Sequence, residues 1–212
     1  MDFILNLVIF AFSIILHEVA HAYSAYLCGD PTAKDEGRIT LNPIPHIDLW
    51  WSIIMPLLFF FSFGKFFGGA KPVPINPLRF YNRRLGITIV SAAGPLINIT
   101  LALIAGLLIN VLLYFNIVNL LIYKICIITI IYNFLLAFFN LLPIPPLDGS
   151  KIPIYFLPSE YEDFIYRTQF IGIFILLIFL NLGGASIIIN LLNFAISQIL
   201  PIQTLMILHL LL

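Results

Sequence analysis

The sequence is poor in charge and in cysteine, and each shortage excludes classes of protein. Charged residues make up 9% of the 212 residues, whereas a soluble domain usually carries about 25%. Ten basic and ten acidic residues give a net charge of zero, so no basic field is available to attract nucleic acid. Cys28 and Cys126 are too few for a disulfide framework and are expected to be buried thiols. A soluble enzyme, a disordered chain and a nucleic-acid-binding protein are therefore excluded.

Apolar residues take the place of charge and form long runs along the chain. Hydrophobic residues make up 61% of the sequence, and a membrane span needs roughly 20 mostly apolar residues. The apolar segments lie at about 3–28, 49–63, 86–115, 118–142, 164–182 and 184–211. We expect an all-α polytopic membrane protein in which residues 1–212 form one domain. No positive charge precedes the first segment, so we expect a retained helix there and not a signal peptide.

The breaks between these segments carry local structural signals. Asn116 separates two apolar segments and predicts a tight helical hairpin, and Gly183-Gly184 separates the last two. Residues 38–42 alternate in polarity like a short strand that Pro43 ends. The proline-rich run at 143–149 cannot be regular helix. These signals predict a helical bundle with one small β element.

The first apolar segment contains the motif His17-Glu18-Val19-Ala20-His21. Residues i and i+4 share a helical face, so both imidazoles can bind one zinc ion. Glu18 lies next to the first of these histidines, where a carboxylate can act as a general base. Ionisable groups at membrane depth are costly and are rarely there without a function. The motif therefore predicts zinc-dependent hydrolysis.

Zinc in a catalytic site needs a third protein ligand and an open fourth position. Asp148 is the best-placed candidate, because irregular backbone at membrane depth is tolerated where it is buried in protein or lines a wet cavity. The other candidates also have ordinary structural explanations as packing, capping or interhelical residues. They are Cys28, His46, Asp48 and His209.

Further polar residues in or near the apolar segments are weaker candidates. Asn140 and Asn98 could donate to an oxyanion or orient a ligand, although interhelical hydrogen bonds would also explain them. Gly94 would permit close approach of two helices. His46 could line the active-site cleft or cap a turn.

Taken together, the motifs resemble the site-2 protease family of intramembrane zinc metalloproteases. The resemblance rests on the HExxH motif, Ala93-Gly94-Pro95-Leu96-Ile97-Asn98, and Phe139-Asn140-Leu141-Leu142-Pro143 leading to Leu147-Asp148-Gly149. Three further stretches resemble its compact prokaryotic branch: Gly29 to Lys34, Gly37 to Pro43 and Ala70 to Pro77. The match runs from about residue 12 to 150.

The resemblance implies both an architecture and a chemistry. It implies a three-helix catalytic core with extra helices, one zinc ion held by His17, His21 and Asp148, and Glu18 as the catalytic base. It also implies cleavage of transmembrane proteins or peptides within the lipid bilayer of a prokaryotic cell. The strand expected at Arg38, Ile39, Thr40, Leu41 and Asn42 could pair with an unwound substrate by β-addition.

The position of Asp148 relative to the histidines constrains the topology. If segment 49–63 crossed the membrane, Asp148 would emerge on the side opposite His17 and His21. We therefore expect that segment to be re-entrant and the N-terminus to lie outside. The basic stretch 65–84 contains five cations and no acid, which indicates a cytoplasmic location and an active site nearer that side.

Two alternatives remain open at the level of sequence. A membrane zinc peptidase that attacks soluble or misfolded chains would take its third ligand from a later glutamate, Glu160 or Glu162. A metal transporter would use the histidine motif for passage of the ion and should have further intramembrane ligands on several helices.

Overall fold

The chain folds into helices joined by irregular loops. The computed structural model describes residues 2–48, 71–117 and 119–201. The elements are α1 (Asp2–Leu27), α2 (Thr32–Asp35), η1 (Ile44–His46), η3 (Pro77–Arg79), α4 (Arg83–Tyr114), α5 (Leu120–Asn140), α6 (Asp148–Lys151), η4 (Ile152–Tyr155), α7 (Ser159–Phe179), η5 (Leu180–Gly184) and α8 (Ala185–Ile199). The predicted segment 49–63 and the candidate ligand His209 lie outside the described residues.

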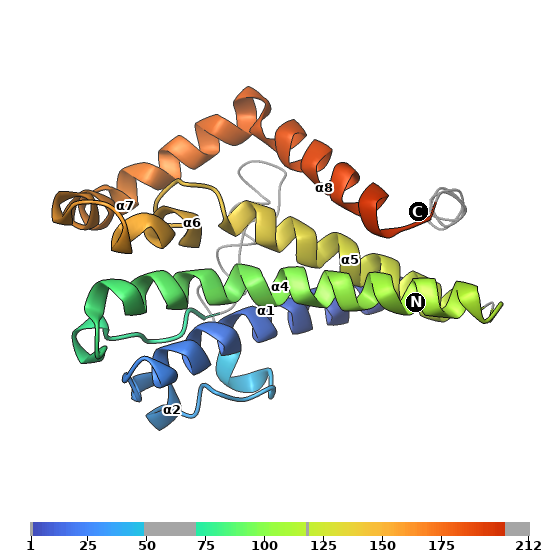
Figure 1. Ribbon diagram of the computed structural model, residues 1–212, viewed down its shortest axis with the longest axis horizontal. Helices are drawn as coiled ribbons and strands as arrows, with labels where there is room; N and C mark the ends of the chain where they lie inside the picture. Colours follow the sequence, from blue (N-terminus) through green and yellow to red (C-terminus); the bar gives the residue numbers. More distant parts are fainter. Residues whose placement is uncertain (1, 49–70, 118, 202–212) are drawn as a thin grey trace.

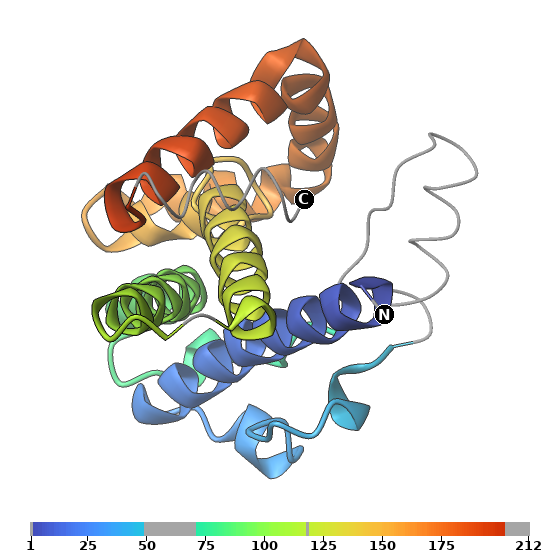
Figure 2. The ribbon, with the colours of Figure 1, turned by 90° about the vertical axis from the view of Figure 1, so that its right-hand side faces the viewer.

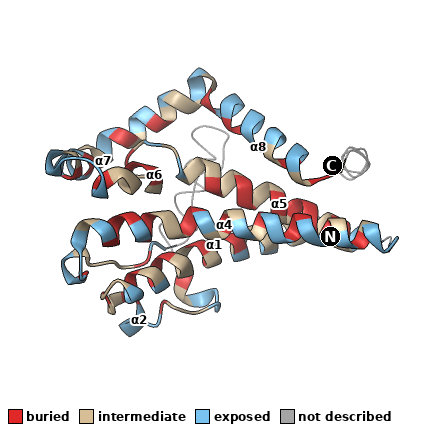
Figure 3. Cartoon of the chain, viewed as in Figure 1, coloured by how far each residue is buried: buried red, intermediate tan, exposed pale blue. Residues whose placement is uncertain are grey.

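Within the described ranges, four helices are long and apolar enough to cross a membrane. They are Phe3–Leu27, Arg83–Tyr114, Leu120–Asn140 and Ser159–Ile199. Large apolar side chains on their outward faces are exposed, as Phe3 and Leu107 are at 77% and 64%. Figure 3 shows the buried residues gathered where helices face one another. This distribution suits a bundle surrounded by lipid.

Three helices, α1, α4 and α5, form the core that the resemblance implied. α4 packs against both α1 and α5, and α1 also contacts α5 (Figures 1 and 2). Between α4 and α5, Ile109, Ile127 and Ile130 are almost completely buried. The predicted hairpin between these two helices is confirmed and turns at Asn116, whose φ of 54° is a left-handed conformation that asparagine tolerates.

The last two helices form a bent arm beside this core. α7 and α8 meet at η5, where Gly183 has a φ of 103°, a conformation that glycine adopts without steric cost. Figure 1 shows the sharp angle between α7 and α8, and α8 returns to pack on α5. The predicted break at Gly183-Gly184 is therefore confirmed.

The predicted strand at 38–42 is wrong, since no strand occurs in the part of the chain that the structure describes. The Asn42 N–H donates to Thr40 Oγ1 at 3.1 Å, and the Ile44 N–H donates to Asn42 Oδ1 at 3.1 Å. Such local side-chain bonds satisfy the backbone and bend it, so they compete with strand pairing. The alternation in polarity was visible in the sequence, but it did not supply a partner strand.

Candidate metal centre

The two histidines of the motif lie on one buried face of α1. His17 and His21 are 6% and 7% exposed, and their Nε2 atoms are 3.0 Å apart. The ring centroids are 4.6 Å apart and the planes are inclined at 85°. The i, i+4 spacing therefore brings two imidazole nitrogens to one point, as the sequence predicted.

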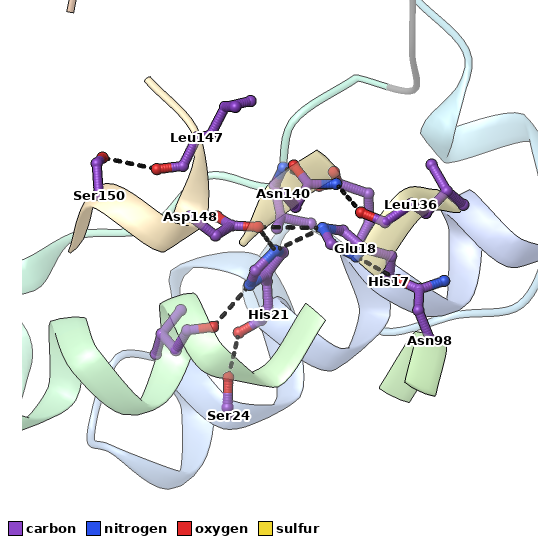
Figure 4. Close-up of polar contacts among 12 residues, drawn as sticks. His17, Glu18, His21, Ser24, Asn98, Leu136, Asn140, Leu147, Asp148 and Ser150 are labelled. Atoms are coloured by element: carbon purple, nitrogen blue, oxygen red, sulfur yellow. Dashed lines mark hydrogen bonds and ion pairs between the residues drawn. The ribbon is translucent and has the colours of Figure 1, made fainter. Parts of the chain in front are cut away.

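Asp148, which lies far along the sequence from the two histidines, is brought to the same point. α5 ends at Asn140, the proline-rich loop follows, and Asp148 begins α6 (Figure 4). Its Oδ2 lies 3.3 Å from the Nε2 atoms of both His17 and His21. These three residues form the group of potential metal ligands found among the described residues.

The spacing of these atoms fits zinc. Bonds of 2.0–2.1 Å in a tetrahedral site place neighbouring ligand atoms roughly 3.3 Å apart. The observed separations of 3.0, 3.3 and 3.3 Å therefore leave room for one ion between the two imidazoles and the carboxylate.

Two groups on α4 hold the other nitrogen of each ring. Asn98 Oδ1 lies 2.6 Å from His17 Nδ1, and the Val90 carbonyl oxygen lies 2.7 Å from His21 Nδ1. Both oxygens are acceptors, so each ring donates from Nδ1, and a neutral ring then presents its Nε2 lone pair toward Asp148. Asn98 was predicted as an oxyanion donor, a ligand-orienting residue or an interhelical bond, and its carboxamide contacts His17 through Oδ1 and Asn133 of α5 through Nδ2.

α4 approaches the histidines closely because residue 94 is glycine. A Cβ at Gly94 would lie 2.5 Å from His17 Cε1 and 2.5 Å from His21 Nε2. The structure therefore agrees with the prediction that Gly94 permits close helix approach.

Two further glycines allow close backbone contacts with the loop that precedes Asp148. A Cβ at Gly149 would meet the backbone of Leu141, and a Cβ at Gly172 of α7 would meet the backbone of Pro145. α7 is therefore packed directly against the chain that delivers the third candidate ligand.

Glu18 lies on the adjacent face of α1 and is half-buried. Its Oε2 accepts a hydrogen bond from the Val73 N–H at 2.9 Å. The buried Arg38 guanidinium donates to the carbonyl oxygens of Lys71 and Pro72 and so fixes the segment that precedes Val73. The carboxylate is thereby held beside the cluster, as Figure 4 shows.

The other predicted site residues form their hydrogen bonds with groups other than the three candidate ligands. Asn140 Nδ2 donates to Leu136 O of its own helix at 2.9 Å (Figure 4). His46 is buried and pairs with Thr40 O at 2.9 Å, so it stabilises its own loop. Ile39, Leu41 and Asn42 lie in that same bent segment.

The alternative ligands are likewise placed elsewhere. Cys28, His46 and Asp48 are not members of the metal-ligand group among the described residues. Glu162 forms an ion pair with Arg83 at 2.6 Å. Of the two cysteines, Cys126 is buried as expected and Cys28 is only half-buried.

Sequence reasoning missed several residues that support the site. Ser13 and Asn133 continue the hydrogen bonds of Asn98 into the core, and both are buried. Their polarity inside apolar segments was a visible signal. Val73 and Val90 act through backbone atoms, for which the side chain gives no signal.

The fold and the site together define a helical membrane protein with a His–His–carboxylate centre suited to zinc. Comparison with known proteins gives the family. The family model "Peptidase family M50" matches residues 116–180. The chain is 35% identical over 196 residues to "Putative zinc metalloprotease YwhC" of Bacillus subtilis (strain 168), covering 90% of this chain and 86% of that protein.

A second relative agrees with this result. The chain is 30% identical over 169 residues to "Putative zinc metalloprotease Rip2" of Mycobacterium tuberculosis (strain ATCC 25618 / H37Rv), covering 79% of this chain and 63% of that protein. No solved structure matches the chain significantly. The chain belongs to peptidase family M50, the site-2 protease family, and is a membrane zinc metalloprotease.

Proposed function

We propose that this zinc metalloprotease is an intramembrane endopeptidase that hydrolyses peptide bonds in transmembrane segments of other proteins. The observation that carries the proposal is the location of the cluster. His17 and His21 are buried in a helix apolar enough to span a membrane, and Asp148 Oδ2 lies 3.3 Å from both of them. Ionisable groups among membrane-spanning helices are costly, which favours a substrate that itself lies in the membrane.

In this proposal His17, His21 and Asp148 hold one zinc ion per chain. The bound ion supplies Lewis-acid polarisation of the scissile carbonyl. Glu18 takes a proton from the attacking water and returns it to the leaving amine. Glu18 Oε2 is occupied by the Val73 N–H, and no hydrogen bond to Oε1 occurs among the described residues, so Oε1 is the oxygen available for proton transfer.

The two asparagines take different parts in this scheme. Asn98 Oδ1 is occupied by His17, so its role is to orient that ring. Asn140 donates one amide hydrogen to Leu136 O, and its second amide hydrogen is available to donate to the developing oxyanion. We assign Asn140 this part in the reaction.

We further propose that the active site opens nearer the cytoplasmic side. α1 ends and α4 begins at the same end of the bundle, where the Tyr81 N–H donates to the Cys28 carbonyl oxygen at 2.9 Å. The cations Lys71, Arg79, Arg83 and Arg84 gather before and at the start of α4, and positive charge favours the cytoplasmic side. The Lys71 N–H also donates to His46 O at 2.8 Å, so the start of this basic stretch lies against the loop that follows α1.

The test compares substrates with purified protein in detergent. Single-span hydrophobic peptides and an unfolded water-soluble protein are incubated with the wild type and with Glu18→Gln, with and without a zinc chelator, and the products are weighed by mass spectrometry. We expect cuts within the hydrophobic stretch of the peptides, lost on chelation and reduced about 10²- to 10⁴-fold in Glu18→Gln, which should retain its zinc. Cleavage of the soluble protein alone would contradict the intramembrane proposal.

A further inference from the structure

A chain of buried polar side chains runs from His17 into the middle of the three-helix core. Ser13 of α1, Asn98 of α4 and Asn133 of α5 are 3%, 0% and 0% exposed. Amides inside a lipid-embedded bundle require partners, and these three residues bond to one another. Each helix of the core thus contributes one polar residue to this hydrogen-bonded network.

In this hydrogen-bonded network, the donor and the acceptor of each bond are fixed. Asn133 Nδ2 donates to the Thr129 carbonyl oxygen at 2.9 Å, and a carbonyl can only accept. The other side of the Asn133 amide, Oδ1, must therefore accept, and it does so from Asn98 Nδ2 at 2.7 Å. This leaves Asn98 Oδ1 to face His17 Nδ1 at 2.6 Å.

The direction carries through to the histidine ring. Because a carboxamide oxygen only accepts, a neutral His17 ring must carry its proton on Nδ1 and keep a lone pair on Nε2. Nε2 is the nitrogen that lies 3.3 Å from Asp148 Oδ2. We propose that Asn133 is a positioning residue that sets the metal-binding tautomer of His17 through Asn98. The consequence for zinc rests on the proposed ligand role of His17.

Without the Asn133 amide, the orientation of Asn98 is poorly defined. Asn98 Nδ2 would keep only its bond of 3.4 Å to the Ser13 carbonyl oxygen. The Asn98 amide could then turn its nitrogen toward His17, which would favour the tautomer that carries the proton on Nε2. That tautomer has no lone pair on Nε2, the nitrogen that faces Asp148 and the proposed zinc position.

The experiment measures the tautomer directly on metal-free protein. Protein labelled with ¹⁵N-histidine is studied in detergent by two-bond ¹H–¹⁵N correlation, at a pH where the rings are neutral, and the His17 signals are assigned by their loss in His17→Gln. Asn133→Ala removes the amide, and Asn133→Leu removes it with little loss of volume. The matched control is Asn110→Leu, because Asn110 also joins two helices, donating to Ile199 O at 2.9 Å, but has no link to His17.

We expect wild type and Asn110→Leu to show His17 protonated on Nδ1, and both Asn133 variants to gain the Nε2-protonated form. Zinc affinity, measured by competition with a chromophoric chelator, should fall about 10- to 100-fold in the Asn133 variants only. Circular dichroism checks that helical content is retained, and Asn133→Ala is tested even if the leucine variant does not fold.

The outcomes separate this inference from the function on which it rests. If His17 stays protonated on Nδ1 in the Asn133 variants, the inference is overturned. If Asn110→Leu shifts the tautomer equally, the effect comes from general loosening and the inference is again overturned. If the tautomer shifts as expected but zinc affinity is unchanged, the inference stands and the ligand role of His17 fails.

Discussion

The contact between α4 and the two histidines can be tested by adding a single methyl group at Gly94. In Gly94→Ala the new Cβ would lie 2.5 Å from His17 Cε1 and His21 Nε2, and 2.6 Å from His17 Nε2. That is about 0.9 Å inside the 3.4 Å at which ordinary contact begins. Either α4 or the imidazoles must move, and metal sites tolerate only about 0.2 Å in ligand distances.

The size of the effect follows from this overlap. Overpacking a close-packed site costs about 1–3 kcal/mol. If the strain is relieved by displacing the imidazoles, the same free energy is lost from zinc binding, which corresponds to roughly a 5- to 150-fold weaker affinity. Zinc affinity of the purified variant, measured by chelator competition, is therefore the assay. Thermal stability is a poorer readout because alanine favours helix over glycine by about 1 kcal/mol.

The control for Gly94→Ala is available in the same helix. A Cβ at Gly106 would lie 2.9 Å from Ile199 Cδ1, which is the flexible end of a side chain that can move away. Gly106→Ala carries the same change in helix propensity and should bind zinc like the wild type. Wild-type affinity in Gly94→Ala would refute the reasoning that the overlap at residue 94 displaces the imidazoles.

Three further predictions concern the ligand set and the elements that hold it. Purified Asp148→Asn should contain little zinc, whereas Glu162→Gln should contain as much as the wild type. Zinc retained in Asp148→Asn but lost in Glu162→Gln would show that Glu162 is the third ligand. Gly172→Val should displace the proline-rich loop, because a Cβ there meets backbone, and should weaken zinc binding by about tenfold or more, as measured by chelator competition. Arg38→Gln should reduce the turnover of a single-span peptide about tenfold or more with normal zinc content, because the chain segment bonded to Glu18 loses its anchor; unchanged turnover would contradict that linkage.

Much of the core of this site could be predicted from sequence because it depends on local geometry. The i, i+4 spacing of His17 and His21 fixes their shared face, and this holds in any helix. The prediction for Asp148 required more, namely that the chain returns to the same side of the membrane before the proline-rich loop. The observed distances of 3.3 Å from Asp148 Oδ2 agree with that argument.

The failures have physical causes of two kinds. The strand at 38–42 failed because Thr40 and Asn42 bond the local backbone, and such bonds compete with pairing that depends on distant residues. Asn133 was missed because a polar residue in an apolar helix indicates that a hydrogen-bond partner exists but does not identify that partner. Only the packing of α5 against α4 shows that the partner is Asn98.

The proposed ligands come from opposite ends of the core sequence, two from α1 and one from the start of α6. An ion bound by all three fastens the N-terminal helix to the remainder of the bundle, because that set of donors exists only when both are docked. The binding free energy then counts toward docking of α1 as well as toward chemistry. Removal of the metal should therefore weaken the packing of α1 against α4 and α5 and leave the α4–α5 hairpin intact.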